Sequence, residues 1–286
     1  MELSSLERPF ICTSLAETTV EETICTLKRA ENAGARAFEV HLPLLGFPGE
    51  AGLSRIASAT RCPVYATCRR GTFYELLGRD AITERDETGR VAELIAAVDA
   101  GLDGVDLELD TFAPTGGPDE FSRAAIREYA DDESTDVAEV TDDEDAVARQ
   151  RAAVERVHDR GGDVVLSAHT YTHLEGEDCV AIAERMTDRG ADLGKIVGLD
   201  RTMDEALETL EAHLRLNEAD VLPYALMAIG TTSRVTRPLS PMFGSAWVFA
   251  QVELTPGGFH SWPRVEDARE ILRRVDWRTA YDPHRE

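Results

Sequence analysis

Residues 190–198 read Gly-Ala-Asp-Leu-Gly-Lys-Ile-Val-Gly, a short apolar run between glycines with one lysine, Lys195, inside it. Such a run is typical of a buried strand. An amphipathic pattern over 177–189 predicts a helix just before it, and residues 163–168 predict a further strand before that helix. A strand, a helix and a second strand in this order indicate a parallel sheet covered by helices.

The same alternation extends over most of the chain. We expect strands at 10–15, 37–42, 63–68, 104–109, 163–168, 192–197, 221–229 and 243–254. We expect helices at 20–33 (ended by Gly34), 54–60, 90–100, 145–159, 177–189, 202–216 (begun by a Thr202–Glu205 capping box) and 265–275. This pattern predicts one α/β domain over residues 1–286, a (β/α)8 TIM barrel. An open doubly wound sheet is the alternative, but no GxGxxG follows the first strand.

The alternation breaks at residues 110–148, after the fourth expected strand. Residues 131–145 carry nine acidic residues and neither Lys nor Arg. Because acids at this density cannot bury themselves together, we expect a solvated acidic insertion within the barrel. Its aromatic residues are expected either to pack locally or to form a lid; they are Phe112, Phe121 and Tyr129.

The chain has 286 residues, 43% of them hydrophobic, and a formal net charge of −24 with a pI near 4.6. Acids spread along the chain and scarce lysine suit a cytoplasmic protein of a halophile, where salt screens like-charge repulsion. The charge argues against nucleic-acid or anionic-membrane partners, which need a basic face. Five cysteines without a CxxC pair argue against a disulfide framework or a zinc site. Neither a signal peptide nor a membrane span is expected.

In a barrel of this kind, chemistry sits at the C-terminal ends of the strands. That rule selects Ser14, Glu39, His41, Arg69, Glu108, His169, Lys195 and the segment after the seventh strand. A buried ammonium is costly unless it is used, and burial lowers the pKa of a lysine, which makes the amine a nucleophile. We therefore expect an imine-forming enzyme with Lys195 as nucleophile. The alternative is a lysine at a strand end with its head in solvent.

Several stretches resemble the type I 3-dehydroquinate dehydratase family, in the family's order and over nearly the whole chain apart from the insertion. Val164–His169 resembles the strand with the catalytic histidine, and Ala191–Ile196 resembles the Schiff-base lysine strand. Ala228–Gly230, Thr236–Arg237 and Phe243–Ser245 resemble the exit from the seventh strand, the carboxylate-binding arginine and the entry to the eighth. Further similar stretches are Ile11–Leu15, Phe38–His41, Pro63–Arg69 and Val265–Leu272.

The resemblance implies dehydration of 3-dehydroquinate to 3-dehydroshikimate in the shikimate pathway, with no cofactor and no metal. Neutral Lys195 would form an imine with the substrate ketone. His169 would remove a proton from the adjacent carbon and later protonate the departing hydroxyl.

The same resemblance implies the residues that hold the substrate, a small anionic carbonyl compound. Arg237 would bind its carboxylate, and Arg69 would also reach it; both cations would further depress the pKa of Lys195. Glu39 would bond substrate hydroxyls or orient Lys195, and Ser14 is expected among the substrate-binding residues.

The sequence departs from the family's pattern around this shell. The family's second-strand arginine is His41 here, and the glutamate that supports its histidine falls near Phe73. Asp106 or Glu108, on the fourth strand, would support His169 instead. Other departures are Thr170 after the histidine, and Leu254 and Gly258 in place of a late serine and glutamine.

Several alternatives stay open. A related imine-forming lyase or aldolase would act on another anionic carbonyl compound, and a non-catalytic barrel would use the acidic insertion as a partner surface. His169 and His173 would form a metal pair in a further alternative, Arg234 competes with Arg237 for the anion, and Glu39 would simply pair with an arginine. A homodimer is an open alternative to a monomer.

Overall fold

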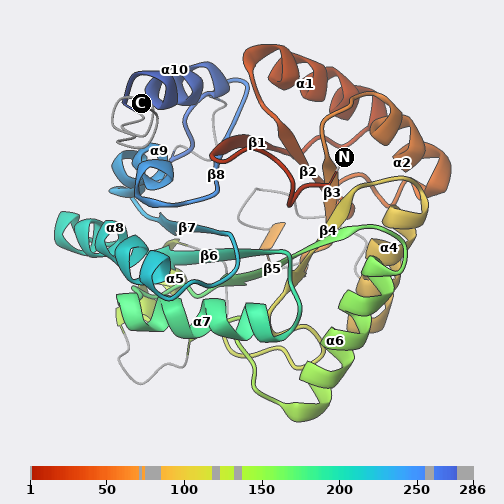
Figure 1. The fold of residues 1–286 in the computed structure, drawn as a ribbon. Coiled ribbons are helices and arrows are strands. Elements are labelled where there is room, and N and C mark those ends of the chain that lie inside the picture. The colour runs from red at the N-terminus through yellow and green to blue at the C-terminus, as the bar shows by residue number, and fades with distance from the viewer. Residues whose placement is uncertain are drawn as a thin grey trace, which may run out of the picture.

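The computed structural model describes residues 2–70, 73–74, 85–117, 123–131, 137–254 and 261–275. Its strands curl into a barrel with helices around the outside (Figure 1). The strands are β1 (Phe10–Leu15), β2 (Ala37–His41), β3 (Val64–Thr67), β4 (Gly104–Glu108), β5 (Asp163–His169), β6 (Leu193–Leu199), β7 (Tyr224–Ile229) and β8 (Trp247–Ala250).

The eight strands form one parallel sheet in the order β7-β6-β5-β4-β3-β2-β1-β8. Strand β8 returns to pair with β1, with Phe10 opposite Trp247. Across the remaining seam, the backbone N–H of Ala246 donates to the carbonyl of Tyr224 at 2.6 Å. The sheet is thus a nearly closed barrel, and the predicted (β/α)8 class is confirmed.

Helices connect successive strands on the outside of the barrel (Figure 1). They are α1 (Val20–Ala33), α2 (Gly49–Ser58), α4 (Glu87–Asp99), α6 (Glu144–His158), α7 (Gly176–Asp188), α8 (Met203–Glu218), α9 (Ser233–Phe243) and α10 (Val265–Val275), with α5 (Arg123–Asp131) inside the 110–148 segment. Gly34 ends α1 with a φ of 122°, and the predicted capping box of Thr202 and Glu205 begins α8. Both predicted helix ends are therefore confirmed.

Two differences from the predicted elements have local causes. Helix α9 was not expected, because Pro238 and Pro241 lie inside it and each removes a backbone donor. Helix α2 begins at Gly49, five residues before the predicted start at 54, directly after Pro48, which is its N-cap residue.

Apolar residues fill the lower half of the barrel interior. Phe10, Tyr65, Leu193 and Trp247 belong to one buried cluster contributed by strands on all sides. Above this cluster, β2, β4 and β6 place polar side chains inside the barrel. They can do so because successive side chains of a strand alternate between the interior and the helix layer. The apolar cluster therefore closes the barrel from below and leaves its C-terminal end for chemistry.

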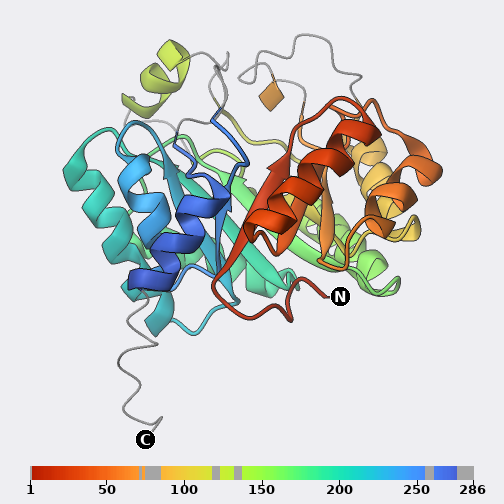
Figure 2. The same ribbon diagram turned by 90° about the horizontal axis from the view of Figure 1, so that it is seen from above.

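The described part of the 110–148 segment covers that C-terminal end. Helix α5 lies beyond the ends of the strands, on the opposite side of the barrel from the N-terminal segment before β1 (Figure 2). Ile126 of α5 and Ala138 are buried against Tyr171 and Leu199 in a small apolar cluster. The expectation of a fully solvated segment was therefore wrong for residues 138, 139 and 141, which are buried. Tyr129 packs against the same cluster, whereas Phe121 lies outside the described residues.

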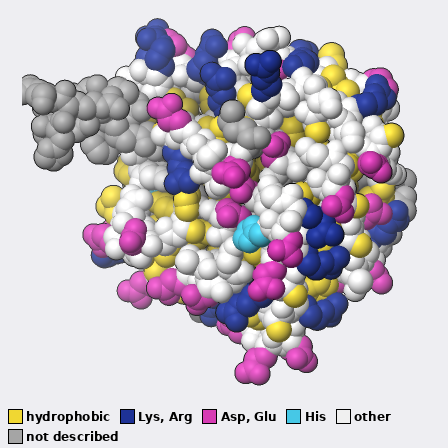
Figure 3. Space-filling view, turned by 45° about the vertical axis from the view of Figure 1, so that its right-hand side comes forward, with side chains coloured by type: hydrophobic (Ala, Val, Ile, Leu, Met, Phe, Trp, Pro, Cys, Tyr) yellow, Lys and Arg dark blue, Asp and Glu magenta, His cyan; other side chains and the backbone are white. Residues whose placement is uncertain are grey.

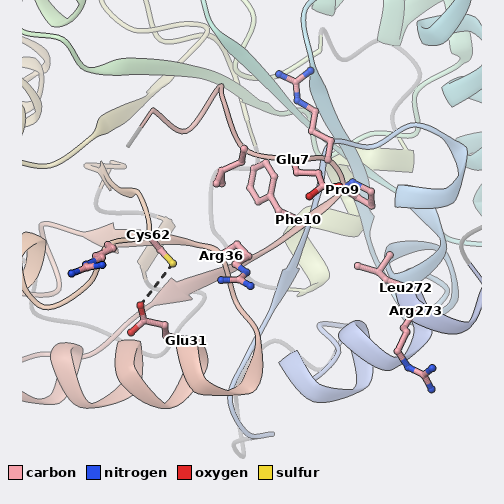
Figure 4. Close-up of a pocket in the computed structure, with 11 residues that line it drawn as sticks. Glu7, Pro9, Phe10, Glu31, Arg36, Cys62, Leu272 and Arg273 are labelled. Atoms are coloured by element: carbon pink, nitrogen blue, oxygen red, sulfur yellow. Dashed lines mark hydrogen bonds between the residues drawn. The ribbon is translucent and has the colours of Figure 1, made fainter. Parts of the chain in front are cut away.

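A cavity of about 690 Å³ opens at the opposite, N-terminal end of the strands (Figure 4). It is lined by Leu6–Phe10, Glu31, Arg36, Arg61, Cys62, Leu272 and Arg273. None of the residues expected to act on substrate lines it, so this cavity is separate from the barrel mouth.

Charged side chains of both signs are interspersed over the face shown in Figure 3. Among the exposed charges of the molecule, ion pairs form between Arg55 and Glu21 and between Arg160 and Asp99. None of the helices in the described ranges combines the length and apolarity that crossing a lipid bilayer requires.

Candidate active site

Lys195 points into the barrel from the third position of β6 and is 5% exposed. Its Nζ donates to Glu39 Oε1 and to Asp106 Oδ2, each at 2.9 Å. Ser167 Oγ donates to the other oxygen of Asp106 at 2.5 Å. The lysine is thus held between two carboxylates from strands across the barrel, and its head is not in solvent.

The charge state of Lys195 differs from the expectation. Burial favours the neutral amine, but the carboxylates of Asp106 and Glu39 outweigh it and raise the pKa of Lys195 above its ordinary value. Arg69 opposes this rise without reversing it. The expected neutral lysine was therefore wrong for the unliganded protein, because two carboxylates that the sequence could not place lie against the amine.

The two carboxylates are not equivalent. Burial would raise the pKa of Glu39, but Lys195 and His41 outweigh it and hold that pKa well below its usual range. Burial does raise the pKa of Asp106; Lys195 opposes the rise and the charge of Glu39 adds to it. Of the two, Asp106 is therefore the carboxylate that accepts a proton more readily.

His169 ends β5, beside the lysine strand. Residues 167 and 169 share the inward face of β5, and Ser167 is the register partner of Lys195. Burial, Arg69 and Lys195 together hold the pKa of His169 well below 6.5, so the imidazole is neutral at pH 7. A neutral imidazole is a competent general base.

Glu139 is the residue that contacts His169, and the sequence interpretation missed it. Glu139 Oε2 lies 3.1 Å from His169 Nδ1 and accepts the backbone N–H of the same residue at 2.8 Å. The expected support residues point elsewhere: Asp106 to Lys195, and Glu108 to Arg90. Burial would raise the pKa of Glu108, but Arg90 and Arg69 outweigh it and lower it to about 2.

Arg69, two residues after β3, is buried beside the histidine. Its Nη2 pairs with Glu139 Oε1, and Phe73 stacks on it with the ring centroid 4.5 Å from Cζ. Its Nε and Nη1 are buried without a hydrogen-bond partner in the described part of the chain. A buried guanidinium with two unused donors is suited to bind an oxygen-rich ligand.

Arg237 is buried on α9 at the exit from β7. Its Nε donates to the carbonyl of Ala228 at 2.9 Å, and Trp262 lies 6.0 Å from its Cζ. Burial lowers the pKa of Arg237 to about 10, and distant Asp200 only partly opposes this. No carboxylate within the described ranges forms an ion pair with it, so it is a cation prepared for an external anion. Arg234, its competitor in the sequence, is exposed.

His41 and Ser14 form a separate hydrogen-bonded group. His41 Nε2 lies 2.7 Å from Ser14 Oγ and 3.5 Å from Glu39 Oε2, and Nδ1 lies 3.2 Å from the hydroxyl of Tyr74. The group therefore contacts Glu39 at Oε2, whereas Lys195 donates to Oε1 of the same carboxylate. Both residues thus lie next to Glu39, which binds Lys195; Ser14 is also the register partner of Glu39 on β1.

The proposed metal pair of His169 and His173 is not formed as a cluster. His173 contacts Asp200 at 3.3 Å and Glu208 at 3.0 Å, whereas His169 contacts Glu139. Within the described ranges, no three His, Cys, Asp or Glu side chains are grouped so that they could hold a metal ion.

The interior of this barrel encloses a lysine among carboxylates, with a neutral histidine on the next strand and buried arginines at the mouth. Such a site defines a class of enzyme. These are barrels that bind a small anionic carbonyl compound over a reactive amine.

Comparison with known proteins places the chain within that class. The chain belongs to the type I 3-dehydroquinase family, whose model matches residues 11–276. The 3-dehydroquinate dehydratase of Methanosarcina mazei is 23% identical over 268 residues, 92% of this chain and 95% of that protein. The Klebsiella pneumoniae protein of the same name is 31% identical over 181 residues, 60% of this chain and 71% of its own.

The fold is shared with solved structures. The 3-dehydroquinate dehydratase of Geobacillus kaustophilus superposes with a TM-score of 0.72 at 16% identity, covering 99% of this chain and 97% of that one. The resemblance drawn from the sequence is thus confirmed, and the chain is a divergent member of an enzyme family of hydro-lyases.

Proposed function

We propose that this protein dehydrates 3-dehydroquinate to 3-dehydroshikimate through an imine on Lys195. One observation carries the proposal: a fully enclosed amine, bonded to Glu39 and Asp106, stands beside a neutral histidine on the neighbouring strand. Membership of the type I family supports the choice of substrate.

Imine formation needs the lysine to lose a proton first. Asp106 Oδ2 lies 2.9 Å from Nζ, and burial raises the pKa of this carboxyl, so the ammonium proton passes to Asp106 when the ketone arrives. The freed amine adds to the carbonyl carbon, and protonated Asp106 returns its proton to the carbinolamine hydroxyl, which leaves as water and gives an iminium as electron sink. Glu39, with its low pKa, stays ionised and stabilises the iminium charge.

Elimination then falls to His169. Its neutral imidazole removes a proton from the carbon next to the iminium, and the resulting imidazolium protonates the departing hydroxyl. Water hydrolyses the iminium and returns the lysine. Arg237 binds the substrate carboxylate, and the unused donors of Arg69 bind substrate oxygens.

The proposed activity is tested directly with purified protein and 3-dehydroquinate. The product carries a double bond conjugated to its carbonyl, so turnover appears as new near-ultraviolet absorbance. Absence of product at substrate concentrations that saturate binding would reject this function.

Arg237→Gln is expected to raise KM on the order of 10- to 100-fold with a smaller change in kcat, because a charge-assisted bond to the carboxylate exists in ground and transition states alike. Steady-state kinetics measure both parameters. Arg234→Gln, three residues earlier on the same helix but exposed, is the matched control and should change neither. Equal effects of the two substitutions would contradict the assignment of Arg237.

A second candidate function is an imine-forming lyase or aldolase acting on a different anionic carbonyl compound. One observation favours it. His41 stands where the family's pattern has an arginine, and both of its ring nitrogens are hydrogen-bonded within the protein, to Ser14 and Tyr74, so neither is available to a substrate. Turnover or trapping with other carbonyl acids, but not with 3-dehydroquinate, would support it.

We also propose that the protein works in a salt-rich cytoplasm. The net charge of −24 in 286 residues destabilises the compact state unless it is screened. The urea midpoint of unfolding at pH 7 is expected to rise with KCl, mostly below about 0.5 M, where the screening length changes fastest. A midpoint that is flat or falls with added KCl would contradict this proposal.

A further inference from the structure

We propose that Glu139, from the segment inserted between β4 and β5, is a positioning residue of the active site: it fixes the imidazole of His169 and the guanidinium of Arg69. The catalytic part of this inference rests on the proposed function. Its geometric part concerns the unliganded protein and is independent of the substrate.

The carboxylate of Glu139 divides its two oxygens between two partners. Oε2 lies 3.1 Å from His169 Nδ1 and accepts the His169 backbone N–H at 2.8 Å, while Oε1 pairs with Arg69 Nη2. Glu139 is only 8% exposed. One buried carboxylate therefore fixes the base and a substrate-facing cation relative to each other.

These contacts decide which nitrogen of His169 carries the proton. Burial raises the pKa of the Glu139 carboxyl, and the Arg69 guanidinium opposes this rise. The ion pair with Arg69 favours the ionised carboxylate, which accepts hydrogen bonds without donating, so Nδ1 of the neutral ring is its N–H donor. Nε2 then keeps its lone pair and is the atom that removes the substrate proton. Without Glu139, the ring has no fixed tautomer and no fixed orientation.

The backbone of the inserted segment is held in place on both sides of Glu139. Glu139 has a φ of +55°, a left-handed conformation that is strained for a non-glycine residue and persists only where the surrounding structure fixes it. The backbone is anchored on both sides: Ala138 is buried in the apolar cluster with Ile126, and the N–H of Val140 donates to Thr115 Oγ1 at 3.2 Å.

The ends of the insertion are joined by a further buried contact. Arg189 binds the carbonyls of Leu109 and Thr141, and Gln150 Nε2 donates to the carbonyls of Leu109 and Thr111 at 3.2 and 2.7 Å. Arg189 thus joins Leu109, before the insertion, to Thr141, two residues after Glu139, and this contact helps to set the position of Glu139 over the barrel mouth.

Phe73 covers the same two partners from another side. Its ring centroid lies 5.9 Å from that of His169, and its ring stacks on Arg69. The edge of the Phe73 ring carries no hydrogen-bond acceptor, so Phe73 cannot fix the His169 imidazole by accepting its N–H. The carboxylate therefore comes from the insertion, which makes that segment part of the active site.

The test replaces Glu139 by Gln and by Ala in the full chain. We expect kcat to fall on the order of 10²-fold in Glu139→Ala and less in Glu139→Gln, whose amide oxygen still accepts a hydrogen bond. Borohydride trapping of Lys195 by 3-dehydroquinate should persist in both variants, since Glu139 does not contact the lysine. Asp145→Asn, at an exposed carboxylate in the same segment, is the matched control and should leave kcat unchanged.

A second readout does not use activity. In ¹⁵N-histidine-labelled, unliganded protein at pH 7.5, the shifts of His169 should show a proton on Nδ1 in the wild type and a loss of this preference in Glu139→Ala. The proposal is overturned if the tautomer is unchanged, or if it changes while kcat stays within about twofold of wild type. If the wild-type protein neither turns over nor traps 3-dehydroquinate, the proposed function fails, and the tautomer alone decides whether Glu139 positions His169.

Discussion

Lys195→Ala is expected to lower kcat by at least about 10⁴-fold while substrate binding persists, because the covalent route is lost and the arginines that bind the anion remain. Turnover is followed by the absorbance of the product, and binding is followed by calorimetry. A variant with kcat near that of the wild type would exclude the imine.

The substitution also changes the electrostatics of the interior. Glu39 and Asp106 would face each other without the ammonium, and loss of one partner from a buried ion pair typically costs about 3–5 kcal/mol of stability. Circular dichroism must therefore show a folded variant before the kinetic result is used. Lys28→Ala is the matched control, because Lys28 is the chain's other lysine and pairs with Glu31 at the surface.

His169→Gln is expected to lower kcat on the order of 10³-fold, the usual size of a general acid–base contribution. The imine still forms, because the amine and its carboxylates are untouched. Borohydride should therefore trap Lys195 in this variant as efficiently as in the wild type. Loss of trapping together with loss of turnover would mean that His169 acts in imine formation or binding.

His173→Gln controls for effects on the loop after β5. His173 lies four residues further along, pairs with Asp200 and Glu208, and should change kcat by less than about twofold.

The pH dependence follows from the same geometry. The pKa of His169 lies well below 6.5, so the base is neutral across the physiological range and loses activity only as the pH falls through that lowered value. We expect kcat/KM to be flat between about pH 6 and 8. A limb that titrates near 6.5 and disappears in His169→Gln would contradict the buried, neutral histidine.

The barrel was predictable from the sequence because its strands are buried on both faces. Such strands appear as short apolar runs between amphipathic helices, and capping residues mark the helix ends. Helix α9 was missed for the converse reason: its helical geometry depends on packing against β7 and β8, whereas Pro238 and Pro241 argue locally against a helix.

Part of the candidate site could be proposed from the sequence, but the charge state of Lys195 could not. Lys195, His169 and Arg237 stand in runs that resemble the family, so they were found without a structure. The raised pKa of Lys195 depends on distances to Glu39 and Asp106, 156 and 89 residues away in the chain, which no local pattern contains.

Glu139 shows the same limit. It lies in an acidic stretch whose composition indicates a solvated segment, and its role depends on contacts with residues 70 and 30 positions away. One local feature distinguishes it: Val137, Ala138 and Val140 surround it with apolar residues, unlike the acids on either side. A short apolar group inside an acidic run is thus an indication of local burial.

The central claim is that the amine of Lys195 forms a covalent bond with the substrate, and borohydride trapping tests it most directly. The native protein is mixed with 3-dehydroquinate, reduced, digested and mapped by mass spectrometry; two lysines in the chain make the assignment unambiguous. We predict one reduced adduct, on Lys195, with Lys28 unmodified. Formation of 3-dehydroshikimate with Lys195 left unmodified would contradict the account.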